Sequence, residues 1–173
     1  WIMKIAPPNF FFETKDYFNK LFCEKDCLNL IGYSKDNGKI DEFKRRFDDM
    51  KIGDIVVVLQ GYQKVFGCVV ITSNSFDEEP QTENSIDWFY HRRKAELLKK
   101  FEPAFTASKA TNRDTIIEYS GDGAVTICDE VWEKIETDYY EFIKNKIKQY
   151  KMEQLNVYKN ILDQYFQIII QGE

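Results

Sequence analysis

Residues 51–70 read KIGDIVVVLQGYQKVFGCVV and contain two apolar runs joined by a short polar stretch. The runs are IVVVL at 55–59 and VFGCVV at 65–70, and the stretch between them carries a glycine. β-Branched runs of this length, bounded by turn residues, are typical of strands. Because neither run alternates with polar residues, we expect both faces to be covered, as in a small barrel or a sheet with helices packed on it. The stretch therefore predicts a buried β-hairpin at the centre of the chain.

Shorter elements are expected on both sides of this hairpin. Pro7 and Pro8 end the first apolar stretch, because proline has no amide hydrogen to donate to a sheet. Thr14 fits an N-cap before apolar residues at helical spacing. The pattern predicts strands at 1–5 and 27–33, helices at 14–22 and 40–50, a turn at 34–38, an acidic loop at 73–87, a strand beginning at Trp88, and a second hairpin joining 115–119 to 124–127.

The last part of the chain has the pattern of a long helix. From Asp129 onward, apolar residues recur at three- and four-residue steps, and neither Pro nor Gly interrupts them before Gly172. This pattern predicts one long helix, or two helices broken near Lys151. We therefore divide the chain into a first domain, 1–128, and a helical extension, 129–173. The extension either leads to a further domain or packs back on the first one.

The composition is that of a globular domain with an excess of aromatic residues. The chain has 173 residues, 43% hydrophobic and 31% charged, which is enough for one domain with a sizeable core. Aromatic residues make up 16%, more than a core needs, so some rings are expected on a recognition surface. The net charge of −5 argues against a strong sequence-independent nucleic-acid binder, but it leaves room for a local basic face. Because apolar runs are short, we expect no membrane partner and a cytoplasmic location.

Catalytic and metal-binding patterns are missing from the sequence. His91 is the only histidine, and there is no G-x-S-x-G nucleophile motif, Walker loop or Rossmann fingerprint. Cys23 and Cys27 are spaced C-x3-C, but no second pair accompanies them as a zinc site would need. We therefore expect a protein that is not an enzyme, holds no metal and no cofactor, and keeps its cysteines reduced.

Basic and aromatic residues meet in one segment of the chain. Clusters of positive charge occur at 44–46, 91–94 and 144–148, and each also fits the solvated side of an element. The second cluster directly follows three successive aromatic residues, Trp88, Phe89 and Tyr90. Rings beside Arg and Lys side chains can form a stacking platform with phosphate anchors. Tyr33 is a further candidate, because a ring at a strand end rims the mouth of a barrel, where pockets form.

The order of short motifs along the chain resembles a known family. A first strand ends in Ile-Ala-Pro at 5–7, a second ends in Ile-Gly-Tyr at 31–33, and Met-Lys-x-Gly-Asp at 50–54 opens the hairpin. The returning strand carries Gly-x-x-x-Ile-Thr-Ser at 67–73, and an acidic loop leads to Tyr-x-x-Arg-Lys at 90–94. Over about residues 1–105, this order resembles the EVE-like and YTH-like domains of the PUA superfamily. It is most similar to the N-terminal DNA-binding domains of McrB-type modification-dependent restriction proteins.

The resemblance implies an α+β fold, a small mixed β-barrel flanked by helices, with the long helix added at the C-terminus. Such domains enclose one nucleobase in an aromatic cage. Tyr33 matches the first aromatic residue of the cage, and the opposite wall is expected from Trp88, Phe89 or Tyr90. Phosphate contacts are expected from Arg92, Arg93, Lys94 and, at the hairpin turn, Lys64.

The resemblance also implies the partners. The expected ligand is DNA with a modified, methylated base, which is read by flipping the base out of the duplex. The expected role is that of the specificity module of a modification-dependent restriction system. Such a system implies a downstream AAA+ motor in the full-length chain and a nuclease subunit.

Two other interpretations remain open. The C-terminal helix can be the functional part, as a protein-interaction or oligomerisation module whose apolar stripe is a seam for a partner. Alternatively, the same fold can read modified RNA instead of DNA, because the superfamily includes RNA readers.

Overall fold

The predicted central hairpin is confirmed as strands β3 (Ile55–Gln60) and β4 (Lys64–Ile71), which pair antiparallel. The computed structural model describes residues 1–5, 14–34, 40–79 and 89–171. The other elements in these ranges are β1 (Ile2–Lys4), α1 (Thr14–Phe22), β2 (Leu30–Tyr33), α2 (Ile40–Asp49), β5 (Phe76–Asp77), β6 (His91–Thr106), β7 (Ile116–Ile117) and α3 (Asp122–Gln171).

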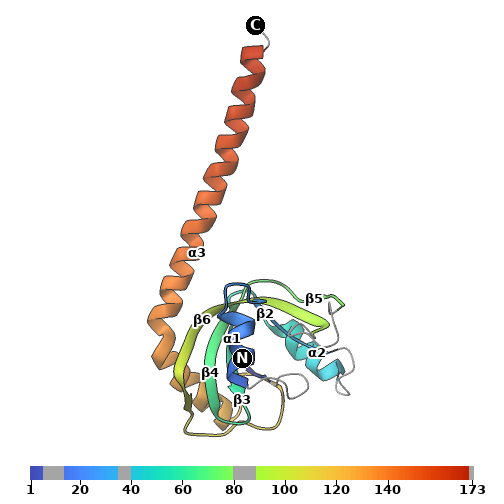
Figure 1. The fold of residues 1–173 in the computed structure, drawn as a ribbon, viewed down its shortest axis with the longest axis vertical. Coiled ribbons are helices and arrows are strands. Elements are labelled where there is room, and N and C mark those ends of the chain that lie inside the picture. Colours follow the sequence, from blue (N-terminus) through green and yellow to red (C-terminus); the bar gives the residue numbers. More distant parts are fainter. Residues whose placement is uncertain (6–13, 35–39, 80–88, 172–173) are drawn as a thin grey trace. The chain divides into compact units, whose positions relative to one another are not determined.

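The strands form a curled, mixed sheet (Figure 1). It is a half-barrel in which six strands follow the order β2-β6-β4-β3-β1-β7. β1 runs parallel to β3, and the other pairs are antiparallel. The start of the long strand β6 pairs with β2 and β5, and its part from Ala95 to Thr106 pairs with β4. The predicted combination of helices and strands with a long C-terminal helix is confirmed, and the expected mixed barrel is confirmed only as a curled half-barrel sheet.

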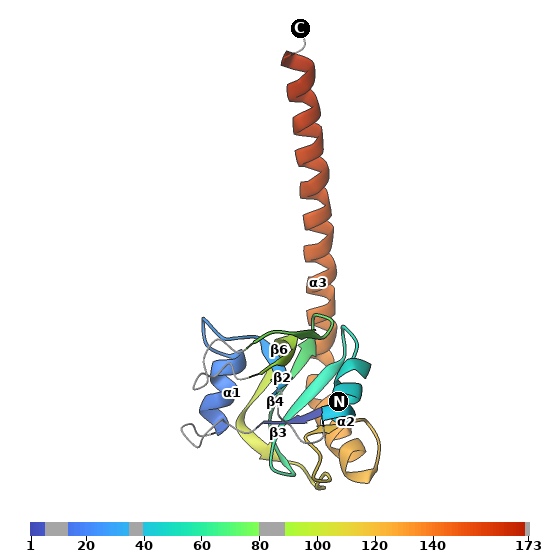
Figure 2. The ribbon, with the colours of Figure 1, turned by 90° about the vertical axis from the view of Figure 1, so that its right-hand side faces the viewer.

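Alternate residues of β3 point into two separate cores. Val56 and Val58 pack with side chains of α1 and α2, whereas Val57 and Leu59 pack with the first turns of α3. Figure 2 shows α1 and the start of α3 on different sides of the strands. All four side chains are at most 3% exposed. This burial explains the unbroken apolar run, because a strand covered on both faces has no position for a polar residue.

The second predicted hairpin is wrong in its second half. Strand β7 forms beside β1, but residues 124–127 belong to α3, which begins at Asp122 rather than at residue 129. The buried side chains of this part of the helix are spaced three and four residues apart: Ala124, Ile127, Val131 and Ile135. The β-branched residues at 125–127 favour a strand locally, but their helical spacing with the later apolar residues prevails.

Most other predicted elements agree with the structure apart from their ends. β6 confirms a strand after Trp88, and α1 has the predicted bounds. β2 starts at Leu30 rather than at residue 27, because Asn29 has a φ of 51°, which interrupts the extended backbone. Trp88, most of the predicted turn at 34–38 and the second half of the acidic loop lie outside the described residues.

Helix α3 belongs to both of the compact units into which the chain divides, Trp1–Ile135 and Glu136–Glu173. The helix is continuous from Asp122 to Gln171, as expected for one long helix rather than two. The first unit extends beyond residue 128, the boundary expected from the sequence, because the first turns of α3 supply part of its core.

Two further features concern the cysteines and the hydropathy of the helices. All four cysteines are free thiols, and only Cys68 is buried. Within the described ranges, none of the helices offers an apolar stretch of the length that a bilayer requires.

Candidate functional site

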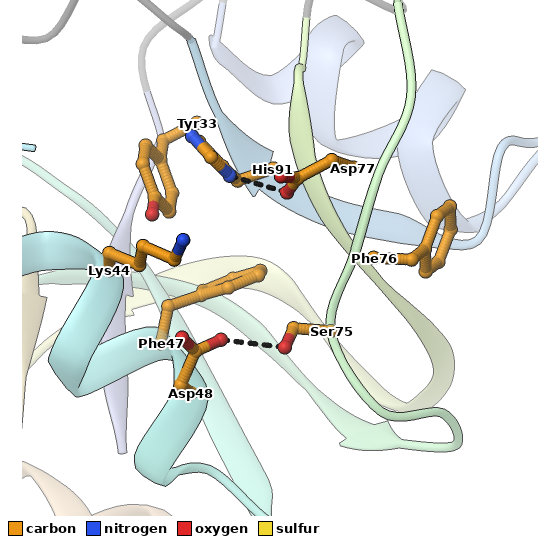
Figure 3. Close-up of a pocket in the computed structure, with 8 residues that line it drawn as sticks. All are labelled: Tyr33, Lys44, Phe47, Asp48, Ser75, Phe76, Asp77 and His91. Atoms are coloured by element: carbon orange, nitrogen blue, oxygen red, sulfur yellow. Dashed lines mark hydrogen bonds and ion pairs between the residues drawn. The ribbon is translucent and has the colours of Figure 1, made fainter.

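A pocket of about 260 Å³ lies where β2, α2, β5 and β6 meet (Figure 3). The register of the sheet creates it, because Tyr33 of β2 and Asp77 of β5 both lie opposite His91, the first residue of β6. We call it the Tyr33 pocket. Its lining residues are Tyr33, Lys44, Phe47, Asp48, Ser75, Phe76, Asp77 and His91.

Helix α2 forms one wall of the Tyr33 pocket. Lys44, Phe47 and Asp48 share one face of the helix because they are three and four positions apart. The ring of Phe47 meets the ring of Tyr33 edge-on, at 5.3 Å between centroids and 88° between planes. Lys44 is exposed, and its side chain extends toward the hollow in Figure 3. The helix thus supplies an aromatic wall, a carboxylate and a cation.

Tyr33 and His91 form a stacked pair on the other side. Their ring centroids are 4.6 Å apart and the planes differ by 27°. Tyr33 is only 3% exposed. Burial, followed by the nearby carboxylates of Asp48 and Asp77, raises the pKa of the Tyr33 phenol above its ordinary value. The phenol therefore stays neutral at physiological pH. The ring of Phe76, in contrast, points away from the other side chains (Figure 3).

Two short hydrogen bonds fix the polar groups of the Tyr33 pocket. Nδ1 of His91 lies 2.6 Å from Oδ1 of Asp77, which orients the imidazole. The hydroxyl of Ser75 donates to Oδ1 of Asp48 at 2.6 Å. Ser75 is therefore bonded to a carboxylate rather than to His91, which is not how a serine nucleophile and its histidine base are arranged.

These groups define what the Tyr33 pocket can hold. Its volume is below the roughly 300–1,000 Å³ typical of sites for drug-sized ligands, so it suits a single planar ring system. The rings of Tyr33, Phe47 and His91 can contact such a ligand by stacking or by their edges. The carboxylates can accept hydrogen bonds from amino groups, and Lys44 can contact an anion.

Arg93, a predicted phosphate contact, has a different role in the structure. It is 2% exposed, and its guanidinium donates to the carbonyl oxygens of Phe47 at 2.8 Å, Ser73 at 3.0 Å and Asp48 at 3.1 Å. Its carbon Cζ lies 5.5 Å from the centroid of the Phe47 ring. Burial lowers its pKa, against the opposing effect of Asp48 and Asp54. Arg93 therefore fixes the end of α2, and with it one wall of the Tyr33 pocket, instead of reaching a ligand.

The other three predicted phosphate contacts lie in different settings. The side chain of Arg92 is 3% exposed and has Nη1 3.3 Å from Oε2 of Glu78, so it is not presented to a phosphate at the surface. Lys94 is exposed and remains a candidate. Lys64 is also exposed, but it lines a second pocket that contains none of the residues of the Tyr33 pocket.

The aromatic residues expected to form the opposite wall do not line the Tyr33 pocket where the structure describes them. Phe89 is 2% exposed and belongs to the core. Tyr90 is a neighbour of the pocket: its amide donates to the carbonyl oxygen of Tyr33 at 3.0 Å, and its ring meets His91 edge-on at 4.8 Å. Trp88 lies outside the described residues.

Sequence reasoning identified Tyr33 but missed the groups around it. From the sequence alone, Phe47 is expected in the core beside its helix, Asp48 is expected at the surface, and His91 is expected in a basic cluster. The spacing of Lys44, Phe47 and Asp48, on the helix directly after the Tyr33 strand, was the available signal. No sequence signal indicated the role of His91, because that role depends on the register of paired strands.

No model of a known protein family matches this chain, and comparison with curated proteins finds no match. The geometry of the pocket is therefore the basis for a functional proposal.

Proposed function

We propose that the Tyr33 pocket binds a single nucleobase of DNA, flipped out of a duplex or taken from a single strand, and that the domain reads a modified base. The observation that carries this proposal is the stacked pair of Tyr33 and His91, with Phe47 edge-on, around a hollow of about 260 Å³. A base has two flat apolar faces and a polar edge. The rings match the faces, and the carboxylates of Asp48 and Asp77 match amino groups on the edge.

The cations available to phosphates differ from those expected from the sequence. Lys44 reaches the pocket from α2, and Lys94 is exposed on β6. They take over the role expected of Arg92 and Arg93, whose side chains are buried. With a net charge of −5, the domain is expected to bind unmodified DNA weakly.

The energetics favour a selective but weak single site. Stacking of one base contributes roughly 1–3 kcal/mol, and flipping a base out of a duplex costs a few kcal/mol. One methyl group in a shaped pocket adds about 1–3 kcal/mol of discrimination. The overall affinity and selectivity of such a domain increase when several copies bind together or when it is linked to a motor.

We further propose that the domain is an EVE-like or YTH-like member of the PUA superfamily. Tyr33, at the end of β2, occupies the place that the resemblance gives to the first cage residue, and it lines the pocket. In this proposal, the domain is the specificity module of a cytoplasmic modification-dependent restriction system. The partners are an AAA+ motor, downstream in the full-length chain, and a nuclease subunit.

The test is a set of anisotropy titrations with fluorescent DNA. Duplexes and single strands carry unmodified bases, 5-methylcytosine or N6-methyladenine at one position. We expect preferential binding of one modified base, by roughly tenfold, from the contribution of a methyl group. Equal and negligible affinity for every oligonucleotide would overturn the proposal.

Two variant pairs connect binding to the Tyr33 pocket. Tyr33→Leu removes the stacking ring and is expected to abolish the preference, while Phe22→Leu, at an equally buried position outside the pocket, retains it. Lys44→Ala is expected to weaken binding and to lower its salt dependence, while Lys51→Ala, also at an exposed lysine, is not. Thermal unfolding of each variant confirms that the fold is intact. Competition with RNA of the same sequence decides between a DNA reader and an RNA reader.

A second candidate function, self-assembly through α3, is favoured by the exposed side chains of the second unit. Ile147, Tyr150, Val157 and Ile161 are each more than 50% exposed. They follow each other at steps of three, seven and four residues, as in the apolar seam of a coiled coil. A helix with such an uncovered stripe is stabilised when a second copy covers it.

Light scattering on the full chain tests this candidate. Self-assembly predicts a constitutive oligomer that Ile147→Glu with Val157→Glu converts to a monomer. The matched control is Asn145→Glu with Asn156→Glu, which adds the same charge away from the stripe. A monomeric wild-type chain at all concentrations, or an oligomer that both double variants retain, would exclude this candidate.

A further inference from the structure

A second pocket lies at an irregularity of the sheet. In the β4–β6 register, Val65 pairs with Phe105 and Gly67 pairs with Lys100, so that one residue of β4 faces four residues of β6. Bulges of this kind redirect side chains and are common next to binding sites. A hollow of about 300 Å³ lies against the bulge, and we call it the bulge pocket. The residues that matter to its chemistry are Phe18, Phe66, Phe101, Lys64, Lys100 and Glu102.

Aromatic rings form the apolar part of the bulge pocket. The rings of Phe18 and Phe66 are stacked, with centroids 6.0 Å apart and planes at 27°. Gly67 makes this packing possible, because a Cβ there would overlap the carbonyl oxygen of Lys99 and lie 2.7 Å from the Phe18 ring. Phe101 adds a half-buried ring from the bulge itself. The result is a surface suited to a flat apolar ligand.

The charged groups of the bulge pocket are not equivalent. Nζ of Lys100 lies 3.0 Å from Oε1 of Glu102, so these two charges offset each other. Lys64 is exposed, and its ammonium lies 5.4 Å from the centroid of the Phe66 ring. Among the described residues, no carboxylate forms an ion pair with Lys64. Of the two lysines that are described as lining this pocket, Lys64 is therefore the one available to meet an anion beside an aromatic wall.

We infer that the bulge pocket binds a nucleotide. The base would lie against Phe66 and Phe101, the phosphate would meet Lys64, and the carboxylate of Glu102 would accept a hydrogen bond from an amino group or a ribose hydroxyl. A ligand with a flat ring, an anion and a donor satisfies all three features. A fatty acid has no amino group or ribose hydroxyl to donate to the carboxylate of Glu102, and it would place its own carboxylate near that one. This inference does not depend on the Tyr33 pocket, which shares no lining residue with the bulge pocket.

The experiment is an NMR titration of the isotopically labelled full chain with adenosine 5′-monophosphate. Saturable shifts are expected at the methyl group of Ala104, which lines the pocket, and at the amide of Gly67, which follows the lining residue Phe66 in β4. Adenosine alone and inorganic phosphate alone are expected to bind more weakly, because each provides only part of the ligand. A short single-stranded oligonucleotide is the second arm. If it shifts the same resonances, the source is a nucleic-acid strand, and if only the mononucleotide does, it is a free nucleotide.

Variants separate the bulge pocket from general charge effects. Lys64→Ala is expected to weaken nucleotide binding on the order of tenfold, as for the loss of a charged hydrogen bond. Lys51→Ala, at an exposed lysine outside both pockets, is expected to leave it unchanged. Ala104→Leu fills the hollow and is expected to abolish binding, with a thermal melt as the check on folding.

Two results would overturn the inference. One is the lack of saturable shifts at Gly67 and Ala104 with nucleotide at millimolar concentration. The other is unchanged affinity in both Lys64→Ala and Ala104→Leu. In the first case, shifts confined to residues of the Tyr33 pocket would support the proposed base-binding function instead.

Discussion

Replacing Arg93 with methionine is expected to lower the free energy of unfolding by about 3–5 kcal/mol. Methionine keeps much of the length of the side chain but removes every donor. The carbonyl oxygens of Phe47, Asp48 and Ser73 then lose a charged partner at 2.8–3.1 Å in an environment where Arg93 is 2% exposed. Two of these oxygens belong to the end of α2, where carbonyls have no partner within the helix.

The magnitude follows from the number and burial of these hydrogen bonds. A hydrogen bond to a charged group contributes about 1.5–3 kcal/mol when it is buried. The three contributions are not additive, because water can reach part of the opened site and because the removed guanidinium no longer needs to be desolvated. Arg93→Lys keeps the charge but not the planar fork, so we expect an intermediate loss of about 2 kcal/mol.

Urea unfolding followed by tryptophan fluorescence measures this loss. Trp1 reports on the first unit, because its indole Nε1 donates to Asp54 at 2.8 Å. The control is Arg45→Met on the same helix. The side chain of Arg45 is 61% exposed and pairs with Asp49 at 3.2 Å and Glu118 at 3.7 Å, so its loss is expected to cost less than about 1 kcal/mol.

The outcome distinguishes a structural from a ligand-binding arginine. If the free energy of unfolding of Arg93→Met lies within about 1 kcal/mol of the wild-type value, the buried hydrogen bonds of Arg93 do not stabilise the fold as argued. The same holds if the variant is stable but flattens the salt dependence of DNA binding, which is the behaviour of a phosphate contact.

Three further predictions address ionisation, close packing and the start of α3. Because burial raises the pKa of Tyr33 in the folded state, the unfolded chain loses that proton first, and stability should fall as the pH rises above about 10. Tyr33→Phe should reduce this dependence in urea titrations. Gly67→Ala should lower the free energy of unfolding, measured by thermal unfolding, by about 3 kcal/mol, because the new methyl group overlaps the backbone. Gly61→Ala should lower it by only about 1 kcal/mol, because a methyl group there has open space and only the φ of 63° is unfavourable. Ile127→Ala should cost about 2–5 kcal/mol at a fully buried helix position, whereas Leu155→Ala, at a position 61% exposed and outside the apolar stripe of α3, should change stability by less than about 0.5 kcal/mol.

The fold was predictable wherever side chains close in sequence decide the structure. The central hairpin follows from two apolar runs and a turn, and α1 follows from an N-cap and helical spacing. Residues 124–127 show where local preference fails. Their β-branched side chains favour a strand, yet burial against the sheet, together with Val131 and Ile135, makes them the first turns of α3.

The candidate site was predictable only in part, for a different reason. Tyr33 was identifiable because it ends an apolar strand. Arg93 was not identifiable as a structural residue, because an arginine in a basic cluster has the same local pattern whether it faces solvent or three carbonyl groups. Its partner at the end of α2, Phe47, is 46 residues away in the sequence.

The sequence by itself determined the hairpin, the helical periods and the presence of a ring at the end of β2, because these depend on neighbours along the chain and on the preferences of individual residues. Only the tertiary structure decided that Asp77 and His91 line the Tyr33 pocket together, that Arg93 is bonded to the end of α2 and that Lys64 lines a different pocket. The physical reason is that strand register and helix packing set which distant groups meet, and the burial that results decides whether a charge faces a ligand or holds the backbone.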